Sequence, residues 1–189
     1  RRHRGAQPRD ATLVNVDTAR RVLRAAESLG YRPNPIARGL KTAKSGTVGV
    51  VLPDLTNPLF PPIVRGIEDV LGEAGYSALI VNTDNDPQRE TTQVDMLRSR
   101  QVEGLIVATA RLEHPFLSRL HEEGTTMVLV NRRADDLDVS SVGPDDSAGI
   151  ELAVRHLAGL GHRRILHLAG PPDTSTGVVR LRAHRAIVR

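Results

Sequence analysis

The sequence predicts an α/β protein in which a doubly wound parallel sheet follows a short, basic, helical N-terminal region. From residue 47 onward, unbroken aliphatic runs of strand length alternate with segments of helical periodicity. Strands that are apolar on both faces belong to parallel sheets with helices on each side, and right-handed crossovers make such a sheet doubly wound. Aromatic residues make up only 2% of the chain, so the hydrophobic residues, which are 39% of it, must form an aliphatic core.

The charges divide the chain into a basic head and an acidic body. Residues 1–45 hold 11 Lys and Arg against three acids, whereas the remaining residues hold 15 against 19; the whole chain has a net charge of +4. We therefore expect a polyanionic partner for the head alone.

The composition also narrows the class of protein. The chain contains no cysteine, which excludes disulfides and cysteine-bound metals and fits the reducing cytoplasm. No apolar run reaches the length of a membrane span, and no apolar stretch follows the N-terminal arginines as it would in a secretory signal. We therefore expect a cytoplasmic protein without a membrane partner.

Within the basic head, one segment has a helical pattern and one does not. Residues 1–14 show no helical period and contain glycine and proline, so we expect disorder there. Residues 16–29 place their apolar side chains on one helical stripe, with Asn15 or Asp17 as the N-cap. Gly30 then stands where a helix ends.

A short helix is predicted inside the tether that joins the head to the body. Asn34 suits the N-cap position, and Pro35 suits the first helical position, where its missing N–H costs nothing. Ile36, Ala37 and Leu40 then share one face. A helix of about six residues is unstable alone in water, so we expect it to order only when a partner packs on it.

The body alternates strands and helices in an order that fits successive β–α units. Strands are expected at residues 47–52, 77–82, 104–108, 127–130, 139–142 and 163–169. Helices are expected from about residue 63 to Gly75, from Pro87 with Asp86 as the cap, over residues 114–123 and 145–161, and from Val178 onward. In the second of these helices, Val94 and Leu97 are expected to face inward.

Polar residues gather where the predicted strands end. Segments 53–60, 82–86, 109–111 and 131–132 follow the first four strands and are rich in Asp, Asn and Thr, which hydrogen-bond hydroxyl and amine groups. The carboxyl ends of parallel strands share one edge of the sheet, and ligands of such folds bind there. The sequence therefore predicts a ligand site at this edge.

Several motifs occur in a fixed order along the chain. They are LGYRPNPIARGL at residues 29–40, TVGVVLPD at 47–54, NPLF at 57–60, GLIV at 104–107, LGHRRI at 160–165 and AGP at 169–171. Their order and spacing resemble those of the corresponding motifs in the LacI family of bacterial transcription regulators, and the resemblance runs from about residue 16 to the end of the sequence. The resemblance implies a periplasmic-binding-protein-like core of two α/β lobes with an effector in the cleft between them.

The resemblance also implies how the chain is divided. Residues 1–45 would be a basic remnant of the DNA-binding headpiece with the hinge helix, residues 46–144 the N-terminal lobe, and residues 145–189 the beginning of a truncated C-terminal lobe. On this interpretation the chain is a fragment that lacks the first headpiece helices and most of the second lobe. An incomplete lobe would leave apolar faces bare.

Site residues follow from their positions in the family's motifs. For DNA binding the resemblance implies Asn34, Ala37, Arg38, Leu40 and Lys41, with Leu40 as the wedge between base pairs. For the effector it implies Leu59, Phe60, Asn131 and Arg180. The family commonly has Asp where this chain has Asn131, so a charged acceptor for sugar hydroxyls is lost. We interpret Asp145 and Asp146 as carboxylates that cap a helix.

The resemblance implies a repressor that binds operator DNA as a homodimer and responds to a sugar or another small metabolite. The sequence shows no catalytic motif, metal-ligand spacing or phosphate-binding glycine loop, so no enzyme, cofactor or metal is expected. Two alternatives remain open. One is a solute-binding protein of the same fold without a DNA role, and the other is an α/β enzyme in which Asp84 and Asp86 bind a cation.

Overall fold

The computed structural model describes residues 15–30 and 44–188, which belong to two compact units divided between residues 43 and 44. The predicted disorder of residues 1–14 and the predicted helix in the tether lie outside the described residues, as do the five residues assigned to DNA. Among the described helices, none is both long and apolar enough to cross a membrane.

Helix α1 (Val16–Ser28) lies in the first unit and confirms the helix predicted in the basic head. The Asn15 side chain caps it, because its Oδ1 accepts a hydrogen bond from the Asp17 N–H at 2.9 Å. Gly30 follows with a φ of +63°, the left-handed conformation that ends many helices. Asn15 and Gly30 therefore mark the start and the end of this helix, as predicted.

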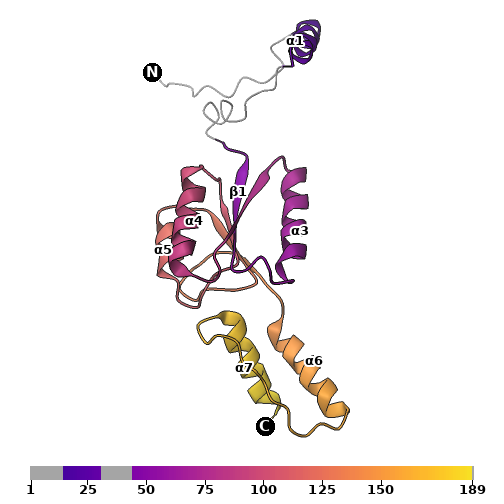
Figure 1. The fold of residues 1–189 in the computed structure, drawn as a ribbon, viewed down its shortest axis with the longest axis vertical. Helices are drawn as coiled ribbons and strands as arrows, with labels where there is room; N and C mark the ends of the chain where they lie inside the picture. Colours follow the sequence, from indigo (N-terminus) through magenta and orange to yellow (C-terminus); the bar gives the residue numbers. More distant parts are fainter. Residues whose placement is uncertain (1–14, 31–43, 189) are drawn as a thin grey trace, which may run out of the picture. The chain divides into compact units, whose positions relative to one another are not determined.

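Five parallel strands form one sheet in the second unit (Figure 1). They are β1 (Thr47–Leu52), β2 (Ser77–Asn82), β3 (Leu105–Val107), β4 (Met127–Val130) and β5 (Ser141–Val142). Their spatial order is β2-β1-β3-β4-β5, so the chain changes direction across the sheet after β2. This confirms the doubly wound parallel sheet. Strands β1, β2 and β4 have the predicted limits, whereas β3 and β5 are shorter.

Three helices connect the strands and cover both faces of the sheet: α3 (Phe60–Glu73), α4 (Pro87–Ser99) and α5 (Pro115–Glu122). The two remaining helices of this unit, α6 (Asp146–Gly159) and α7 (Ser175–Ile187), follow β5 and pack against each other. In Figure 1, α4 and α5 lie on one side of β1 and α3 lies on the other. The Asp86 side chain caps α4 as predicted, since it accepts hydrogen bonds from the backbone N–H groups of Gln88 and Arg89.

The sheet separates two aliphatic layers of core. On the side of α4 and α5, Val94 and Leu97 are fully buried as predicted, together with aliphatic side chains of β1, β3 and β4. On the side of α3, Phe60 packs with Val50 and Leu52. Burying one such side chain is worth about 1.5–3 kcal/mol, so each layer contributes strongly to holding the sheet together.

The strand predicted at residues 163–169 is wrong. This segment has no regular structure, although its side chains alternate as in a strand: Ile165 and His167 are half-buried, whereas Leu166 and Leu168 are 86% and 88% exposed. A strand exists only where backbone N–H and C=O groups meet those of a neighbour, and no strand in the described part of the chain pairs with this segment. Alternating exposure of side chains is therefore not sufficient for a segment to form a strand.

Of the two C-terminal helices, α7 begins earlier than predicted and α6 leaves apolar side chains exposed. Helix α7 begins at Ser175, three residues earlier than predicted, because the Thr174 hydroxyl caps it by accepting the Gly177 N–H at 3.2 Å. Within α6, Val154 is the one buried residue, and Leu152 is largely exposed. Apolar side chains of this segment therefore face solvent.

We expect Gly49→Ala to destabilise the protein by about 1–3 kcal/mol. A Cβ on this β1 residue would stand 2.7 Å from Leu105 Cδ2 and 2.8 Å from Leu97 Cδ1, and the core holds both leucines in place. The matched control is Gly66→Ala in α3, where a Cβ meets nothing within 4 Å and should stabilise the helix by about 0.5–1 kcal/mol. Urea unfolding measures both. A Gly49 variant as stable as the control would contradict the described packing.

Candidate functional site

The loops after β1 and β2 meet at the carboxyl edge of the sheet. The Leu55 N–H donates a hydrogen bond to Asn82 Oδ1 at 3.0 Å, which joins the loop after β1 to the last residue of β2. The Asp54 carboxylate accepts the hydroxyl and the N–H of Thr56 at 2.6 and 2.8 Å, and these hydrogen bonds lower the pKa of Asp54. Two of the polar segments predicted to gather here are therefore physically linked.

Left-handed backbone conformations occur at the same edge. Asp84 and Asn85 follow β2 with φ of 52° and 58°, and Asn131 follows β4 with φ of 66°. A left-handed conformation costs a residue with a Cβ about 1–2 kcal/mol, although Asn and Asp tolerate it best. Among the described non-glycine residues, only Gln101, after α4, has such a φ elsewhere. Backbone strain is thus concentrated in the loops that would face a ligand.

A hollow of about 330 Å³, the edge pocket, opens between the end of β4, β5 and the first turns of α6 and α7. Its lining residues are Asn131, Arg133, Ser141, Gly143, Pro144, Asp145, Asp146, Ser175 and Val179. The volume is that of a small-molecule site, and the lining offers amide, hydroxyl, carboxylate and guanidinium groups. Asn131, one of the predicted effector residues, lies in this lining.

Arg180 is held beside the edge pocket by an ion pair. Its Nε donates to Asp146 Oδ1 at 2.7 Å, and the Asp146 side chain is only 12% exposed. Of the two carboxylates interpreted as caps, Asp145 caps α6 by accepting the Ala148 N–H at 2.9 Å, whereas Asp146 is engaged by Arg180. The ion pair joins the start of α6 to α7 and so fixes one wall of the pocket.

Leu59 and Phe60 do not belong to the lining of the edge pocket. Phe60 begins α3 and is only 2% exposed, because its ring packs in the core with Val50 and Leu52. Leu59, directly before α3, is exposed. Of the four predicted effector residues, Asn131 thus lines the edge pocket and Arg180 lies beside it through Asp146. The assignment of all four to the effector stays a prediction.

A buried polar network, which the sequence motifs did not predict, joins α4 to the end of β3 and the start of α5. Glu90 is 2% exposed; the Thr109 hydroxyl donates to its carboxylate, and His114 Nε2 lies 3.2 Å from it. The Arg111 N–H donates to His114 Nδ1 at 3.3 Å, which leaves the Nε2 proton directed at Glu90. Glu90 lies on the buried face of α4, so helical periodicity could have identified it.

Asp136 ties the start of α5 to the loop after β4. Its carboxylate accepts the His114 N–H at 2.9 Å and the Ser118 hydroxyl at 3.0 Å. Slight desolvation acts to raise the pKa of the exposed Asp136, but these hydrogen bonds outweigh it and lower the pKa below its ordinary value. The charged form of the carboxylate is therefore stabilised by the fold.

The two acids considered for a cation serve the loop between β2 and α4. Asp86 caps α4, and Asp84 is bound by Arg89 and by the Asn82 amide. Across residues 15–30 and 44–188, no group of three or more potential metal ligands gathers in space.

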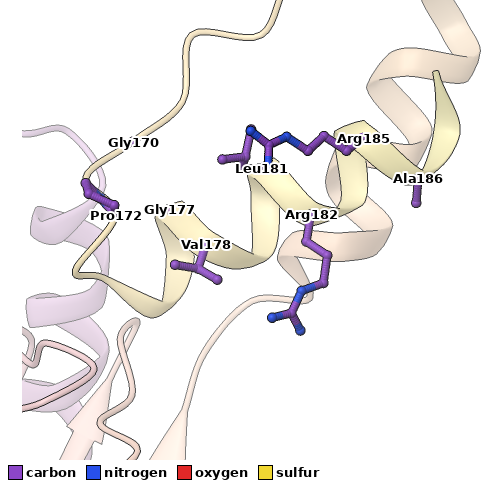
Figure 2. A pocket seen from close by; sticks show the side chains of 8 residues that line it. All are labelled: Gly170, Pro172, Gly177, Val178, Leu181, Arg182, Arg185 and Ala186. Atoms are coloured by element: carbon purple, nitrogen blue, oxygen red, sulfur yellow. The ribbon is translucent and has the colours of Figure 1, made fainter. Parts of the chain in front are cut away.

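A second hollow, of about 450 Å³, lies along α7 and the loop before it (Figure 2). Its lining residues are Gly170, Pro172, Gly177, Val178, Leu181, Arg182, Arg185 and Ala186. Gly177 is required here because a Cβ at this position would stand 2.1 Å from the Pro171 carbonyl oxygen. None of the predicted site residues belongs to this lining, so it adds nothing to the predicted site.

Residues 45–187 match the family described as periplasmic binding proteins and the sugar-binding domain of the LacI family. The chain belongs to the LacI family. The resemblance predicted from the motifs is therefore confirmed, and so is the periplasmic-binding-protein-like fold.

The curated LacI-family relatives of this chain are transcription regulators. The HTH-type transcriptional regulator PtxS of Pseudomonas aeruginosa is 39% identical over 180 residues, which are 95% of this chain and 53% of PtxS. The HTH-type transcriptional repressor CytR of Escherichia coli is 33% identical over 178 residues, which are 93% of this chain and 52% of CytR. The chain thus spans about half the length of the curated relatives it matches.

Solved structures of the family share the fold. A putative ribose operon repressor from Burkholderia thailandensis is 32% identical with a TM-score of 0.70, over 76% of this chain and 55% of its own. Cra from Pseudomonas putida in complex with fructose 1-phosphate is 27% identical with a TM-score of 0.69, over 75% and 53%. A complex of the regulator CelR with cellobiose is 28% identical with a TM-score of 0.66, over 92% and 53%.

We expect Asp136→Asn to lower the free energy of unfolding at neutral pH by up to about 1 kcal/mol, a modest amount because the side chain is exposed. The folded pKa of Asp136 lies below its ordinary value of 3.8, so its contribution is present above that value and is lost as the pH falls through the folded pKa. The difference from wild type should therefore shrink on acidification. Urea unfolding at a series of pH values measures it.

The control for this test is Asp138→Asn. Asp138 is exposed on the same loop, and no hydrogen bond to its carboxylate is present among the described residues. The Asp138→Asn variant should therefore have nearly the same free energy of unfolding as wild type across the pH series. A difference between the Asp136 variant and wild type that stayed constant from neutral to strongly acidic pH would contradict the assigned role.

Proposed function

We propose that the protein is a transcriptional repressor of the LacI family that binds operator DNA and changes its DNA affinity when a sugar or a related small metabolite binds at the carboxyl edge of the sheet. One observation carries this proposal. The segment that matches the LacI sugar-binding model, residues 45–187, contains a polar pocket at the edge where parallel sheets bind ligands.

The lining of the edge pocket supports a hydroxylated ligand. Asn131, Ser141 and Ser175 offer amide and hydroxyl groups, and Asp145 and Asp146 offer carboxylates that accept hydrogen bonds from sugar hydroxyls. The similar regulators Cra and CelR are solved with fructose 1-phosphate and cellobiose. A sugar or a sugar derivative is therefore the class of effector that we propose here.

The basic head supports DNA as the macromolecular partner. Residues 1–45 carry 11 Lys and Arg against three acids, and contacts of such residues with phosphates supply much of the affinity for DNA. The similarity to PtxS covers 180 residues, so it extends well beyond residues 45–187 and into the head. A solute-binding protein of the same fold needs no such head, which favours the regulator over that alternative.

The hinge residues supply the proposed contacts with DNA. They are Asn34, Ala37, Arg38, Leu40 and Lys41, with Leu40 inserted between base pairs from the minor groove. A homodimer would place two hinges side by side on a palindromic operator. Effector binding at the edge pocket would shift the population between dimers that can and cannot hold both hinges on DNA.

We expect the full-length protein to select a specific fragment from its own genomic DNA, and a sugar or small metabolite to change the affinity of that complex. Fragment selection followed by fluorescence anisotropy at physiological salt measures both. Equal, salt-sensitive binding to all fragments would contradict a repressor. Tight sugar binding without any selective DNA complex would support the solute-binding alternative instead.

We expect Leu40→Ala to weaken the operator complex by about tenfold or more, because the kinked duplex loses its apolar wedge. The affinity for sugar should not change, since the residues that line the edge pocket all lie between positions 131 and 179 of the sequence. Leu160→Ala, which removes an exposed leucine from the body, is the control and should leave both affinities unchanged. Anisotropy titrations compare the variants, and equal operator affinity in both would refute the role of Leu40.

A further inference from the structure

The Glu103 side chain holds the chain at the point where it passes from the tether into the sheet. Its Oε1 accepts the Gly46 N–H at 2.8 Å, and its Oε2 accepts the Tyr76 hydroxyl at 3.1 Å. Gly46 directly precedes β1, Tyr76 directly precedes β2, and Glu103 lies two residues before β3. Because these strands are neighbours in the order β2-β1-β3, one carboxylate joins the beginnings of all three.

Backbone hydrogen bonds strengthen the same junction. The Ser77 N–H donates to the Gly46 carbonyl at 2.9 Å, and the Glu103 N–H donates to the Thr47 carbonyl at 2.8 Å. The Ser45 and Thr47 hydroxyl oxygens lie 2.8 Å apart and share a hydrogen bond. Gly46 itself has a φ of +64°, a left-handed conformation in which the chain turns. The direction in which the chain leaves β1 toward the tether is therefore set by short, directional contacts.

The hydrophobic core does not account for the presence of this carboxylate. Glu103 and Tyr76 are half-buried, and neither belongs to the two aliphatic layers on the faces of the sheet. An ionised carboxylate accepts hydrogen bonds more strongly than a neutral oxygen does. The charge of Glu103 therefore acts on the two donors that meet it, and one of them is the backbone of Gly46.

We propose that Glu103 is a positioning residue for DNA binding, which fixes the direction of the tether so that the two hinges of a dimer meet the operator at one spacing. This inference rests on the proposed function. Leu40, the proposed wedge, stands six positions before Gly46. Six residues can span up to about 20 Å, so a small change of direction at Gly46 displaces the hinge by several ångströms. A tether held in advance also loses less conformational freedom when the hinge binds.

The test compares Glu103→Ala with Glu122→Ala in the full-length protein. Both variants lose one negative charge, so the general electrostatic effect on DNA affinity is matched. Glu122 is exposed at the end of α5, and among the described residues its side chain forms no hydrogen bond or ion pair. We expect Glu103→Ala to bind the fragment selected by the wild-type protein about tenfold more weakly than Glu122→Ala does, as measured by fluorescence anisotropy.

The spacing of the operator half-sites distinguishes positioning from a role in stability alone. The wild-type protein should discriminate against operators whose half-sites are moved by one base pair, and Glu103→Ala should lose most of this discrimination. Glu103→Gln keeps an oxygen that can accept the Gly46 N–H, so it should recover part of it. Urea unfolding follows the stability of each variant. If Glu103→Ala is less stable but keeps the wild-type spacing preference, Glu103 only stabilises the sheet and the proposal is overturned.

Hydrogen exchange tests the contact with Gly46 without DNA. The Gly46 amide should exchange about tenfold or more faster in Glu103→Ala than in Glu122→Ala, because it loses its acceptor. Equal protection of this amide in the two variants would overturn the proposal.

Two results separate failure of this inference from failure of the proposed function. If the wild-type protein selects an operator, and Glu103→Ala binds it with the affinity and the spacing preference of Glu122→Ala, the positioning role is refuted and the repressor stands. If the wild-type protein forms no selective DNA complex, the repressor is contradicted, and a positioning role in DNA binding is overturned with it.

Discussion

The pairing of β1 with β2 on one side and with β3 on the other is the interaction on which the second unit depends. All pairs in the sheet are parallel, so the carboxyl ends of the strands, and the loops that follow them, reach the same edge. Each ladder hydrogen bond adds only about 0.5–1.5 kcal/mol net, and the apolar layers on both faces supply the larger stabilisation. Gly49 permits this arrangement because Leu97 and Leu105 occupy the space that its side chain would need.

The same edge is where the sheet meets the C-terminal helices. The Leu112 N–H donates to the Asp173 carbonyl at 2.9 Å, and the Arg133 N–H donates to the Ser175 hydroxyl at 2.9 Å. These directional contacts hold the start of α7 against the loops after β3 and β4. Each of these hydrogen bonds contributes only about 0.5–1.5 kcal/mol net, so a ligand bound among them would need only a modest differential affinity to favour one arrangement of these loops over another. Ligand binding and movement of the C-terminal segment are therefore expected to be coupled.

Much of the fold could be predicted because its signals are local. Strand β1 is an uninterrupted aliphatic run, and Asp86 followed by Pro87 is a cap that needs no distant partner. The errors arise where a neighbour decides the outcome. Residues 163–169 have the pattern of a strand, but the described part of the chain offers no strand for them to pair with.

The candidate site was harder to predict than the fold, since its contacts join residues far apart in the sequence: Arg132 reaches Asn85 across 47 positions.

The most direct test of the account is a crystal structure of the full-length protein with its effector bound. The account predicts the ligand at the carboxyl edge, between Asn131 and the start of α7. A ligand in the hollow along α7, or anywhere away from this edge, would contradict it.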